Sequence, residues 1–458
     1  MTLEPPSTPG EGPRPLRRRP AFCLLLAFVC VRMALAAVVV AHPDGGVIID
    51  SGGYMALARL LVHAGNYLHP AGQDLIWPPG YPLLIAAASL WQEPNPVAIA
   101  VLQLGMTGML TLCLVWIGAR AAGQNAGLAA GWLYALSPNA ALWAMTVMSE
   151  TAFSVLLVLG VAASLSVILW RRRAAALAAG LTLGAASLVR PAGTLLILLW
   201  AGSLFAFLRR SQGSRSAAVN VLLLILGGVA VILPWMVRNQ VARGEFVFSN
   251  VAAKTIYGFN VASVLAEARG ISRDEAVQEI GAGGDDWGDS MRVLATYPEV
   301  FAVQQLEGIL RTSVGVESGV WARQLGLGRE FQGSFGVLSA LRAGQPGVAF
   351  TRLQQQLRSP ETAPHAYLFL LGAGYTLGVW GLFGMALLRG RHWPPLAAQV
   401  AVLVGITVAY ILLIPGAAGQ ARFRVSVEPL LALVAGFLWA PDAWSVHQHP
   451  LPGRMQTT

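Results

Sequence analysis

Long apolar runs dominate the chain, and short polar stretches separate them. A helix needs about 20 mostly apolar residues to cross the hydrocarbon core of a bilayer. The pattern predicts ten such spans, at 21–41, 96–118, 123–141, 151–170, 174–189, 192–208, 217–236, 366–388, 394–414 and 425–440. The apolar piece from Tyr81 to Trp91 is shorter, and predicts a re-entrant or interfacial segment. We therefore expect an all-α polytopic membrane protein.

The polar stretches between the runs predict how the chain is organised. Residues 1–20 begin with a stretch rich in Pro and Gly, which predicts a disordered cytoplasmic N-terminus. Residues 21–237 form an N-terminal membrane module with a long first outer loop at 42–95. Residues 238–364 form a second outer loop that is long enough to fold by itself. The C-terminal membrane helices follow at 365–440, and a cytoplasmic tail at 441–458.

Composition supports lipid as the main solvent of the side chains. Of the 458 residues, 55% are hydrophobic and only 12% are charged, whereas a soluble domain carries about 25% charged residues. The net charge is +9, but the arginines lie between apolar runs, so we expect no nucleic-acid partner. Cys23, Cys30 and Cys113 lie inside apolar runs and show neither a disulfide framework nor metal-ligand spacing.

The arginines also predict an orientation. Clusters of arginine fall at alternate ends of the spans: Arg17–Arg19, Arg120, Arg171–Arg173, Arg209, Arg210, Arg215, Arg389 and Arg391. The positive-inside rule places these clusters in the cytoplasm together with the N-terminus. Ala34-Leu35-Ala36 fits a signal-peptide cleavage site, but the many spans that follow favour an uncleaved first helix. We expect a multi-pass protein of the inner (plasma) membrane.

Asp50 is the first candidate for chemistry on the outer face. It lies just past the first span, and Tyr54 and Ala58 follow it at spacings of one helical turn, so the three share one face of a helix. A carboxylate there can act as a base, bind a metal ion, or serve as the N-cap of a helix that begins with Ser51-Gly52-Gly53. Spacing alone leaves these three interpretations open.

Glu150 is the second outer carboxylate, at the start of the fourth span. An acidic residue in the first turn of a helix is stabilised by the helix dipole, and Ser149 is a candidate cap. We therefore expect Glu150 to support the site and not to perform the chemistry.

Four arginines lie on the face that the positive-inside rule leaves poor in arginine, and each needs a partner there: Arg190, Arg238, Arg422 and Arg424. Arg422 or Arg424 can simply pair with Glu428. Taken together, the four are better explained by a phosphate, which the planar guanidinium fork recognises well. Two carboxylates and several arginines suit a reaction on a lipid-linked phosphate.

Six short motifs, in order along the chain, resemble the polytopic glycosyltransferases of the GT-C fold. The similarity is greatest to the bacterial branch related to protein mannosyltransferases and lipid A aminoarabinose transferases. The motifs are Asp50-x-x-x-Tyr54-x-x-x-Ala58, Pro78-Pro79-Gly80-Tyr81-Pro82, Ser149-Glu150, Leu188-Val189-Arg190-Pro191, Pro234-Trp235-x-x-Arg238-Asn239, and Arg422-Phe423-Arg424 with Glu428-Pro429.

This resemblance implies transfer of a hexose or pentose from a polyprenyl-phosphate sugar at the non-cytoplasmic face. The acceptor is a lipid, a glycan or a protein. Asp50 matches the acidic residue that serves as catalytic base, and Tyr54 and Glu150 support it. We expect the four outer arginines to bind the phosphate of the donor. No residue is assigned to a metal, although a divalent metal cofactor stays open. The absence of a P-loop motif agrees with a donor that is already lipid-linked.

Two other classes of function stay open. A transporter or lipid flippase usually places ionisable groups near the bilayer midplane, and Arg32 is the charge that lies well inside an expected span. A membrane scaffold would use the outer arginines only for structural pairs. The gathering of ionisable residues at one edge of the spans favours the enzyme.

Overall fold

The protein is a bundle of helices, and its described residues form no β-strand. The structure is a computed structural model that describes residues 18–283, 287–327, 340 and 344–440. Most of the predicted N-terminal tail, Arg17 and the predicted tail at 441–458 lie outside the described residues. The all-α fold expected from the apolar pattern is confirmed.

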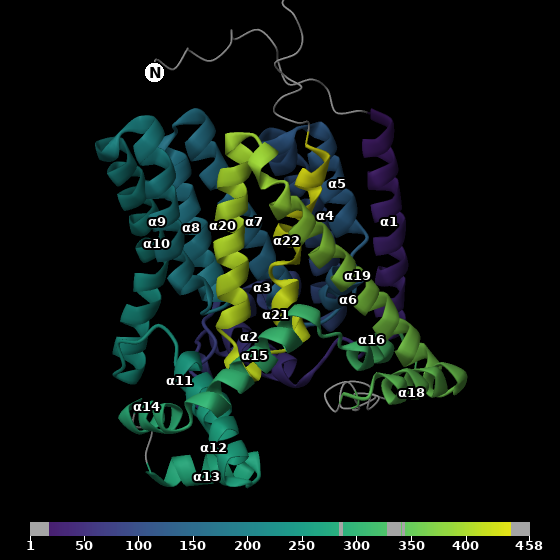
Figure 1. Ribbon diagram of the computed structural model, residues 1–458. Coiled ribbons are helices and arrows are strands. Elements are labelled where there is room, and N and C mark those ends of the chain that lie inside the picture. The colour runs from purple at the N-terminus through teal and green to yellow at the C-terminus, as the bar shows by residue number, and fades with distance from the viewer. Residues whose placement is uncertain (1–17, 284–286, 328–339, 341–343, 441–458) are drawn as a thin grey trace, which may run out of the picture.

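Seven helices are long and apolar enough to cross a membrane, and they run side by side (Figure 1). They are α1 (Arg18–Ala41), α4 (Pro96–Ala122), α7 (Glu150–Trp170), α9 (Gly193–Gln212), α10 (Ser214–Arg243), α19 (Ala363–Leu388) and α20 (Pro395–Leu413). By length and composition, the described chain is a multi-pass membrane protein.

The other three predicted spans differ from expectation, so the count of ten full-length spans is not confirmed. Two are shorter apolar helices: α8 (Arg173–Val189), and α22 (Glu428–Gly436) extended by the 3-10 turn η5 (Phe437–Trp439). The run at 123–141 is divided into α5 (Gln124–Ala135) and α6 (Pro138–Ala144). Pro138 lacks a backbone N–H and suits a first turn, so a new helix begins there.

Helix α10 is longer than the predicted span at 217–236 and continues to Arg243. Pro234 lies inside it. As a result, Arg238 and Asn239 lie in the last turns of this helix and not in the loop that follows.

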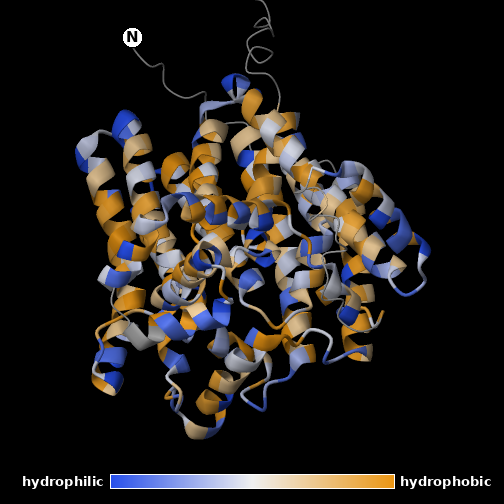
Figure 2. Ribbon diagram, turned by 60° about the horizontal axis from the view of Figure 1, so that its bottom comes forward, coloured by the Kyte–Doolittle hydropathy of each residue, from blue (hydrophilic) through white to orange (hydrophobic). Residues whose placement is uncertain are grey.

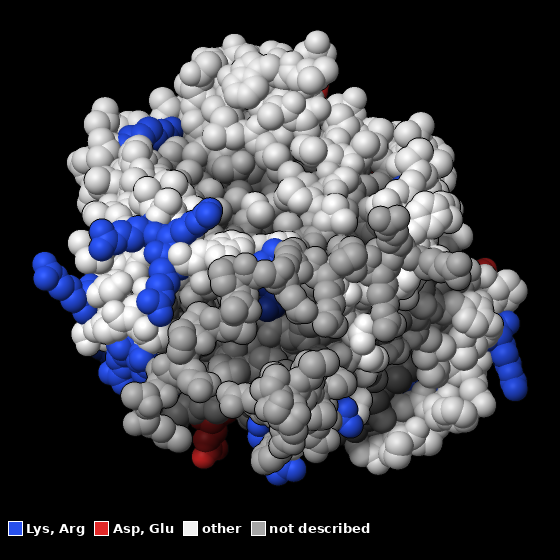
Figure 3. All heavy atoms as spheres, turned by 90° about the horizontal axis from the view of Figure 1, so that it is seen from above, with Lys and Arg blue, Asp and Glu red and all other residues white. Residues whose placement is uncertain are grey.

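One end of the bundle carries the arginine clusters. The chain enters α1 at this end, and the α4–α5, α7–α8, α9–α10 and α19–α20 connections return to it (Figure 1). These connections contain no Asp or Glu residue, and Figure 3 shows the Lys and Arg side chains spread over this face. The alternation of charge predicted from the sequence is therefore present in the arrangement of the helices.

The opposite end carries both outer loops (Figure 1). The first contains α2 (Ile49–Ala64), the short turn η1 (Gln73–Leu75) and α3 (Gly80–Ala88). Helix α3 has nine residues, too few to cross a bilayer, as predicted for this segment. When this end is turned toward the viewer, hydrophilic residues lie in its middle, among the ends of the apolar helices (Figure 2).

The second outer loop is almost wholly helical in its described part. Its elements are α11 (Val251–Thr255), η2 (Ile256–Val261), α12 (Ala262–Arg269), α13 (Arg273–Gly283), α14 (Trp287–Thr296), α15 (Pro298–Val314), α16 (Ser318–Gln324) and α18 (Pro346–Arg358). Helix α20 then leads through η4 (Gly416–Ala418) and α21 (Ala421–Val425) into α22. Helices α15 and α21 contact each other, which brings the second loop to the middle of this end.

Candidate active site

Asp50 forms an ion pair with Arg422, 372 positions further along the chain. The Arg422 Nη1 atom lies 2.6 Å from the Asp50 Oδ2 atom, and the two side chains are 15% and 36% exposed. Helix α2 begins at Ile49, with Ile48 as the cap residue. The interpretation of Asp50 as a cap is therefore wrong, since its carboxylate is free to point from the first turn toward Arg422.

Glu150 forms a second ion pair, with Arg190. The Arg190 Nη1 atom lies 2.6 Å from the Glu150 Oε1 atom, and the Glu150 side chain is only 1% exposed. Ser149 occupies the cap position of α7, but its hydroxyl does not cap the helix. The hydroxyl instead accepts a hydrogen bond from Arg190 at 3.3 Å. Glu150 thus opens α7 as predicted, buried against an arginine.

Phe423 brings the two ion pairs together. Its ring centroid lies 5.3 Å from the guanidinium carbon of Arg190 and 5.2 Å from that of Arg422. Both distances are typical of cation–π contacts. Burial works against the charge of Arg422, but Glu150 and Asp50 outweigh it and raise the pKa of the guanidinium. Arg422 therefore stays charged, and the guanidinium groups of Arg190 and Arg422 both contact one aromatic ring.

Tyr54 lies beneath these pairs and is buried, as is Ala58 one turn further on. The ring contacts Trp77 and Tyr81, with centroid distances of 5.1 and 4.9 Å. Its hydroxyl lies 3.4 Å from that of Ser149. Burial raises the pKa of the Tyr54 phenol, so Tyr54 stays neutral and works through hydrogen bonds.

Two glycines allow the first outer loop to approach so closely. A Cβ atom on Gly53 would lie 2.1 Å from the Trp77 ring, and one on Gly80 would lie 2.6 Å from the backbone of Leu188. Because Gly53 has no side chain, Trp77 can pack directly against α2. In the same way, Gly80 lets the start of α3 pack against the end of α8. Arg190 is the residue that ends α8, so this contact fixes the position of its backbone.

Glu317 belongs to the same cluster and was not predicted. It lies between α15 and α16, where its Oε1 atom accepts the backbone N–H of Arg422 at 3.4 Å. Burial raises the pKa of Glu317, and Arg422 offsets part of that effect. Nothing in the local sequence marks this residue, because its importance comes only from the packing of α15 against α21.

Arg424 faces away from these pairs. Its Nη1 atom donates to the carbonyl oxygens of Thr312, Ser313 and Gly315 at 3.1, 2.9 and 3.0 Å. These carbonyls end α15, where a helix leaves acceptors unpaired and favours a positive charge. The Nε atom lies 3.6 Å from Glu428, and Arg424 is 1% exposed. Of the two arginines weighed for pairing with Glu428, Arg424 is therefore the one that makes the pair.

Glu428 is fixed from the other side by the break between α5 and α6. Its carboxylate accepts from the Ser137 hydroxyl at 2.8 Å and from the Asn139 amide at 2.5 Å. The divided span at 123–141 thus provides polar partners for a carboxylate inside the bundle.

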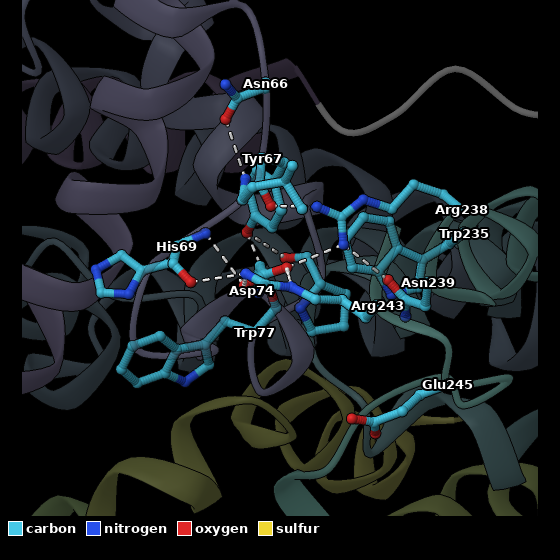
Figure 4. A network of polar contacts seen from close by, with 12 residues as sticks. Asn66, Tyr67, His69, Asp74, Trp77, Trp235, Arg238, Asn239, Arg243 and Glu245 are labelled. Carbon is cyan, nitrogen blue, oxygen red and sulfur yellow. Dashed lines mark hydrogen bonds and ion pairs between the residues drawn. The ribbon is translucent and has the colours of Figure 1, made fainter. Parts of the chain in front are cut away.

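Arg238 lies in a different cluster, around the buried carboxylate of Asp74 (Figure 4). The Arg238 Nη1 atom donates to Asp74 Oδ2 at 3.0 Å, and Arg243 donates to both carboxylate oxygens. Arg238 and Arg243 also bind the carbonyls of Tyr67 and His69. Burial works against the charge of Asp74, but its hydrogen bonds from Arg243 and Arg238 prevail and lower its pKa.

The Asp74 cluster joins the end of α10 to the first outer loop. Asp74 was not predicted, and its sequence surroundings, Gln73 and Leu75, give no signal. The spacing of Arg238 and Arg243 at the end of one helix was the available hint. Tyr67 extends the cluster toward the site by donating to the carbonyl of Trp77 at 2.9 Å.

The structure thus brings together six of the residues that matter: Asp50, Tyr54, Ser149, Glu150, Arg190 and Arg422. Arg238 and Arg424 lie in the neighbouring clusters described above. Among the described residues, no group of three or more His, Cys, Asp or Glu side chains is arranged to hold a metal ion. The cluster combines two arginines with two carboxylates, and Glu317, whose pKa is raised by burial, lies beside it.

Comparisons with known proteins give similarity at the level of structure. No protein-family profile matches the chain, and no curated protein matches its sequence. Among solved structures, it is similar to the oligosaccharyltransferase AglB from Archaeoglobus fulgidus in complex with an inhibitory peptide and a dolichol-phosphate. The TM-score is 0.49 at 13% identity, over 91% of this chain and 50% of AglB. The chain therefore spans about half the length of that protein.

A second similar structure is ArnT from Cupriavidus metallidurans bound to undecaprenyl phosphate. The TM-score is 0.43 at 16% identity, and the match covers 91% of this chain and 77% of ArnT. Both solved structures hold a lipid phosphate, dolichol-phosphate in AglB and undecaprenyl phosphate in ArnT.

Proposed function

We propose that this protein is a membrane glycosyltransferase that moves a sugar from a polyprenyl-phosphate donor to an acceptor hydroxyl. The observation that carries the proposal is the convergence of Asp50, Arg422 and Arg190 at one end of an apolar bundle. These residues come from three distant parts of the chain. A base beside two guanidinium groups, at the end of apolar helices long enough to cross a membrane, suits a lipid-linked phosphate.

In this proposal Arg422 is the main ligand of the donor phosphate, and Arg190 is the second. Both guanidinium groups contact the Phe423 ring, and both arginine side chains are partly exposed, at 15% and 16%. A hydrogen bond from a charged guanidinium to a phosphate anion is stronger than one between neutral groups. Arg238 and Arg424 contribute indirectly, because Asp74 and the end of α15 occupy their guanidinium groups.

Asp50 is the base in this proposal. The acceptor oxygen attacks the anomeric carbon and forms the new glycosidic bond, while Asp50 takes the proton from the hydroxyl. The bond between that carbon and the phosphate oxygen breaks, and its electron pair stays on the phosphate. The products are the glycosylated acceptor, with inverted configuration, and the polyprenyl phosphate. The two arginines stabilise the charge that develops on the leaving phosphate.

Tyr54 and Glu150 support this arrangement. Glu150 and the Ser149 hydroxyl fix the Arg190 guanidinium, and Tyr54 fills the space beneath with a neutral phenol. The proposed orientation places this end of the bundle outside the cytoplasm, in accord with the arginine clusters at the other end. For an inner-membrane protein, the substrates are then sugars and acceptors of the cell envelope.

A direct assay tests the proposal. The full chain in lipid nanodiscs is supplied with a radiolabelled polyprenyl-phosphate hexose or pentose and cell-envelope extract. We expect label to move to an acceptor, or to be released by slow hydrolysis, and Asp50→Asn to slow both by about 10²–10⁴. Uptake of label into sealed vesicles without any bond cleavage would support the transporter instead.

A further inference from the structure

The two ion pairs at the site differ in how easily they can be broken. Glu150 is 1% exposed, whereas the Asp50 side chain is 36% exposed. Separating a buried carboxylate from its arginine leaves a charge without water or partner, which typically disfavours the separated state by more than a hundredfold. A partly exposed carboxylate is instead solvated by water when its partner leaves. Separation of such an ion pair is therefore disfavoured by about fivefold at most.

Arg422 also has capacity for a further acceptor. Its Nε atom is buried and, among the described residues, has no hydrogen-bond partner. Its Nη1 atom binds Asp50, and its backbone N–H binds Glu317. A planar guanidinium offers several N–H groups to a phosphate, and the unused Nε–H of Arg422 is one of them.

We propose that the Asp50–Arg422 ion pair is exchanged when the donor binds, so that the phosphate takes the place of Asp50 on Arg422 and releases Asp50 as the base. This inference rests on the proposed function and adds a regulation to it. In the empty site, Arg422 holds the Oδ2 atom of Asp50, and this oxygen is then unavailable to an acceptor hydroxyl. The Glu150–Arg190 pair stays intact and keeps the second cation in place.

Exchange predicts that Asp50 competes with the phosphate. Removing its charge should therefore tighten binding of a lipid phosphate, whereas a residue that only performs catalysis would leave binding unchanged. The gain should disappear when Arg422 is absent, because the competition is for that guanidinium alone.

Equilibrium binding of undecaprenyl phosphate to the full chain in phosphatidylcholine nanodiscs tests this. We expect Asp50→Asn to bind about fivefold more tightly than wild type, and Arg422→Gln to bind more weakly. The double variant should bind like Arg422→Gln. Asp50→Ser should give the same gain and serves if Asp50→Asn does not fold. Undecaprenol, which has no phosphate, should show no difference between wild type and Asp50→Asn.

The matched control is Asp44→Asn, which removes the same charge from an exposed position in the same loop. An equal gain from Asp44→Asn would overturn the exchange, because the effect would then be a general change of charge. Unchanged affinity in Asp50→Asn and Asp50→Ser, with weaker binding in Arg422→Gln, would also overturn it while leaving the proposed function standing. If neither Arg422→Gln nor Arg190→Gln weakened binding, the proposed phosphate site itself would be wrong.

Discussion

Arg422 and Arg424 are two positions apart on α21, yet their guanidinium groups serve opposite sides of it. Arg422 turns outward to Asp50, and Arg424 turns inward to the last carbonyls of α15. In sequence the two look interchangeable. Their burial separates them, since Arg424 is 1% exposed and Arg422 is 15% exposed.

This division predicts opposite effects of the two charge-removing variants. Arg422→Gln should weaken binding of the lipid-phosphate donor by about 1–3 kcal/mol, the usual loss for a charged hydrogen bond, with little change in melting temperature. Arg424→Gln should lower the melting temperature, because it leaves the end of α15 and Glu428 without a cation. Titration of the donor and thermal unfolding of each purified variant separate the two roles. Equal loss of donor affinity in both variants, at unchanged stability, would contradict the division.

Asp50→Asn should lower turnover by about 10²–10⁴, the usual contribution of a positioned general base. The amide keeps the shape of the side chain and cannot take the proton. Stability should change little, since the carboxylate is partly exposed and Ile48, not Asp50, caps α2. Turnover is measured on purified protein with labelled donor, and Asp44→Asn is the control. Wild-type turnover of Asp50→Asn would remove the base from the proposal.

Glu150→Gln should keep measurable activity but unfold more readily. The change leaves the Arg190 guanidinium without its buried counter-charge, and breaking a buried pair typically destabilises by about 3–5 kcal/mol. The glutamine can still accept a hydrogen bond from Arg190, so we expect a value at the lower end. Scanning calorimetry measures the stability of Glu150→Gln, and the transfer assay measures its activity. A stable but inactive Glu150→Gln beside an active Asp50→Asn would reverse the roles of the two carboxylates.

Asp74→Asn should lower stability near pH 7, and the difference should shrink in acid. Its lowered pKa means that the folded protein favours the ionised carboxylate. That stabilisation is present above the pKa of the unfolded chain and is lost as the pH falls below about 4 through the lowered value. We expect a deficit of about 1–3 kcal/mol at pH 7. Unfolding of both proteins at pH 7 and pH 3.5 checks it, and a deficit that stays constant would argue against the ion pair as its cause.

The orientation of the bundle can be tested by labelling single cysteines from outside the cell. Ala64→Cys at the end of α2 and Ser211→Cys near the end of α9 are both exposed and lie at opposite ends of the bundle. The background carries Ala at Cys23, Cys30 and Cys113. An impermeant maleimide should label Ala64→Cys in intact cells and Ser211→Cys only after lysis. The reverse pattern would place the proposed site in the cytoplasm.

The apolar pattern predicted the bundle well, because the length of a membrane crossing constrains sequence strongly. It failed at residues 123–141, where the run continues but Ser137 and Pro138 divide the helix. Pro138 begins the new helix, and the polar groups at this break bind Glu428 of α22 through the Ser137 hydroxyl and the Asn139 amide. A window of hydropathy averages over two such polar residues and does not detect their partner.

Residues of the proposed site could be predicted where a charged residue departed from the expected positive-inside pattern. Arg190 and Arg422 stood out on a face that should contain few arginines, and Asp50 and Glu150 followed from their positions beside spans. Which carboxylate faces which arginine was not predictable, since the pairs join residues from different helices. Asp74 and Glu317 were missed because acidic residues are common in outer loops, and only burial distinguishes these two.

The separation between Asp50 and Arg422 in sequence also determines how long after Asp50 its partner is synthesised. Ribosomes add about 5–20 residues per second, so the 372 positions between the two residues correspond to roughly 20–70 s of synthesis. During that interval the Asp50 carboxylate is made but its guanidinium partner is not. The proposed active site can therefore be completed only after α21, which carries Arg422, has been made.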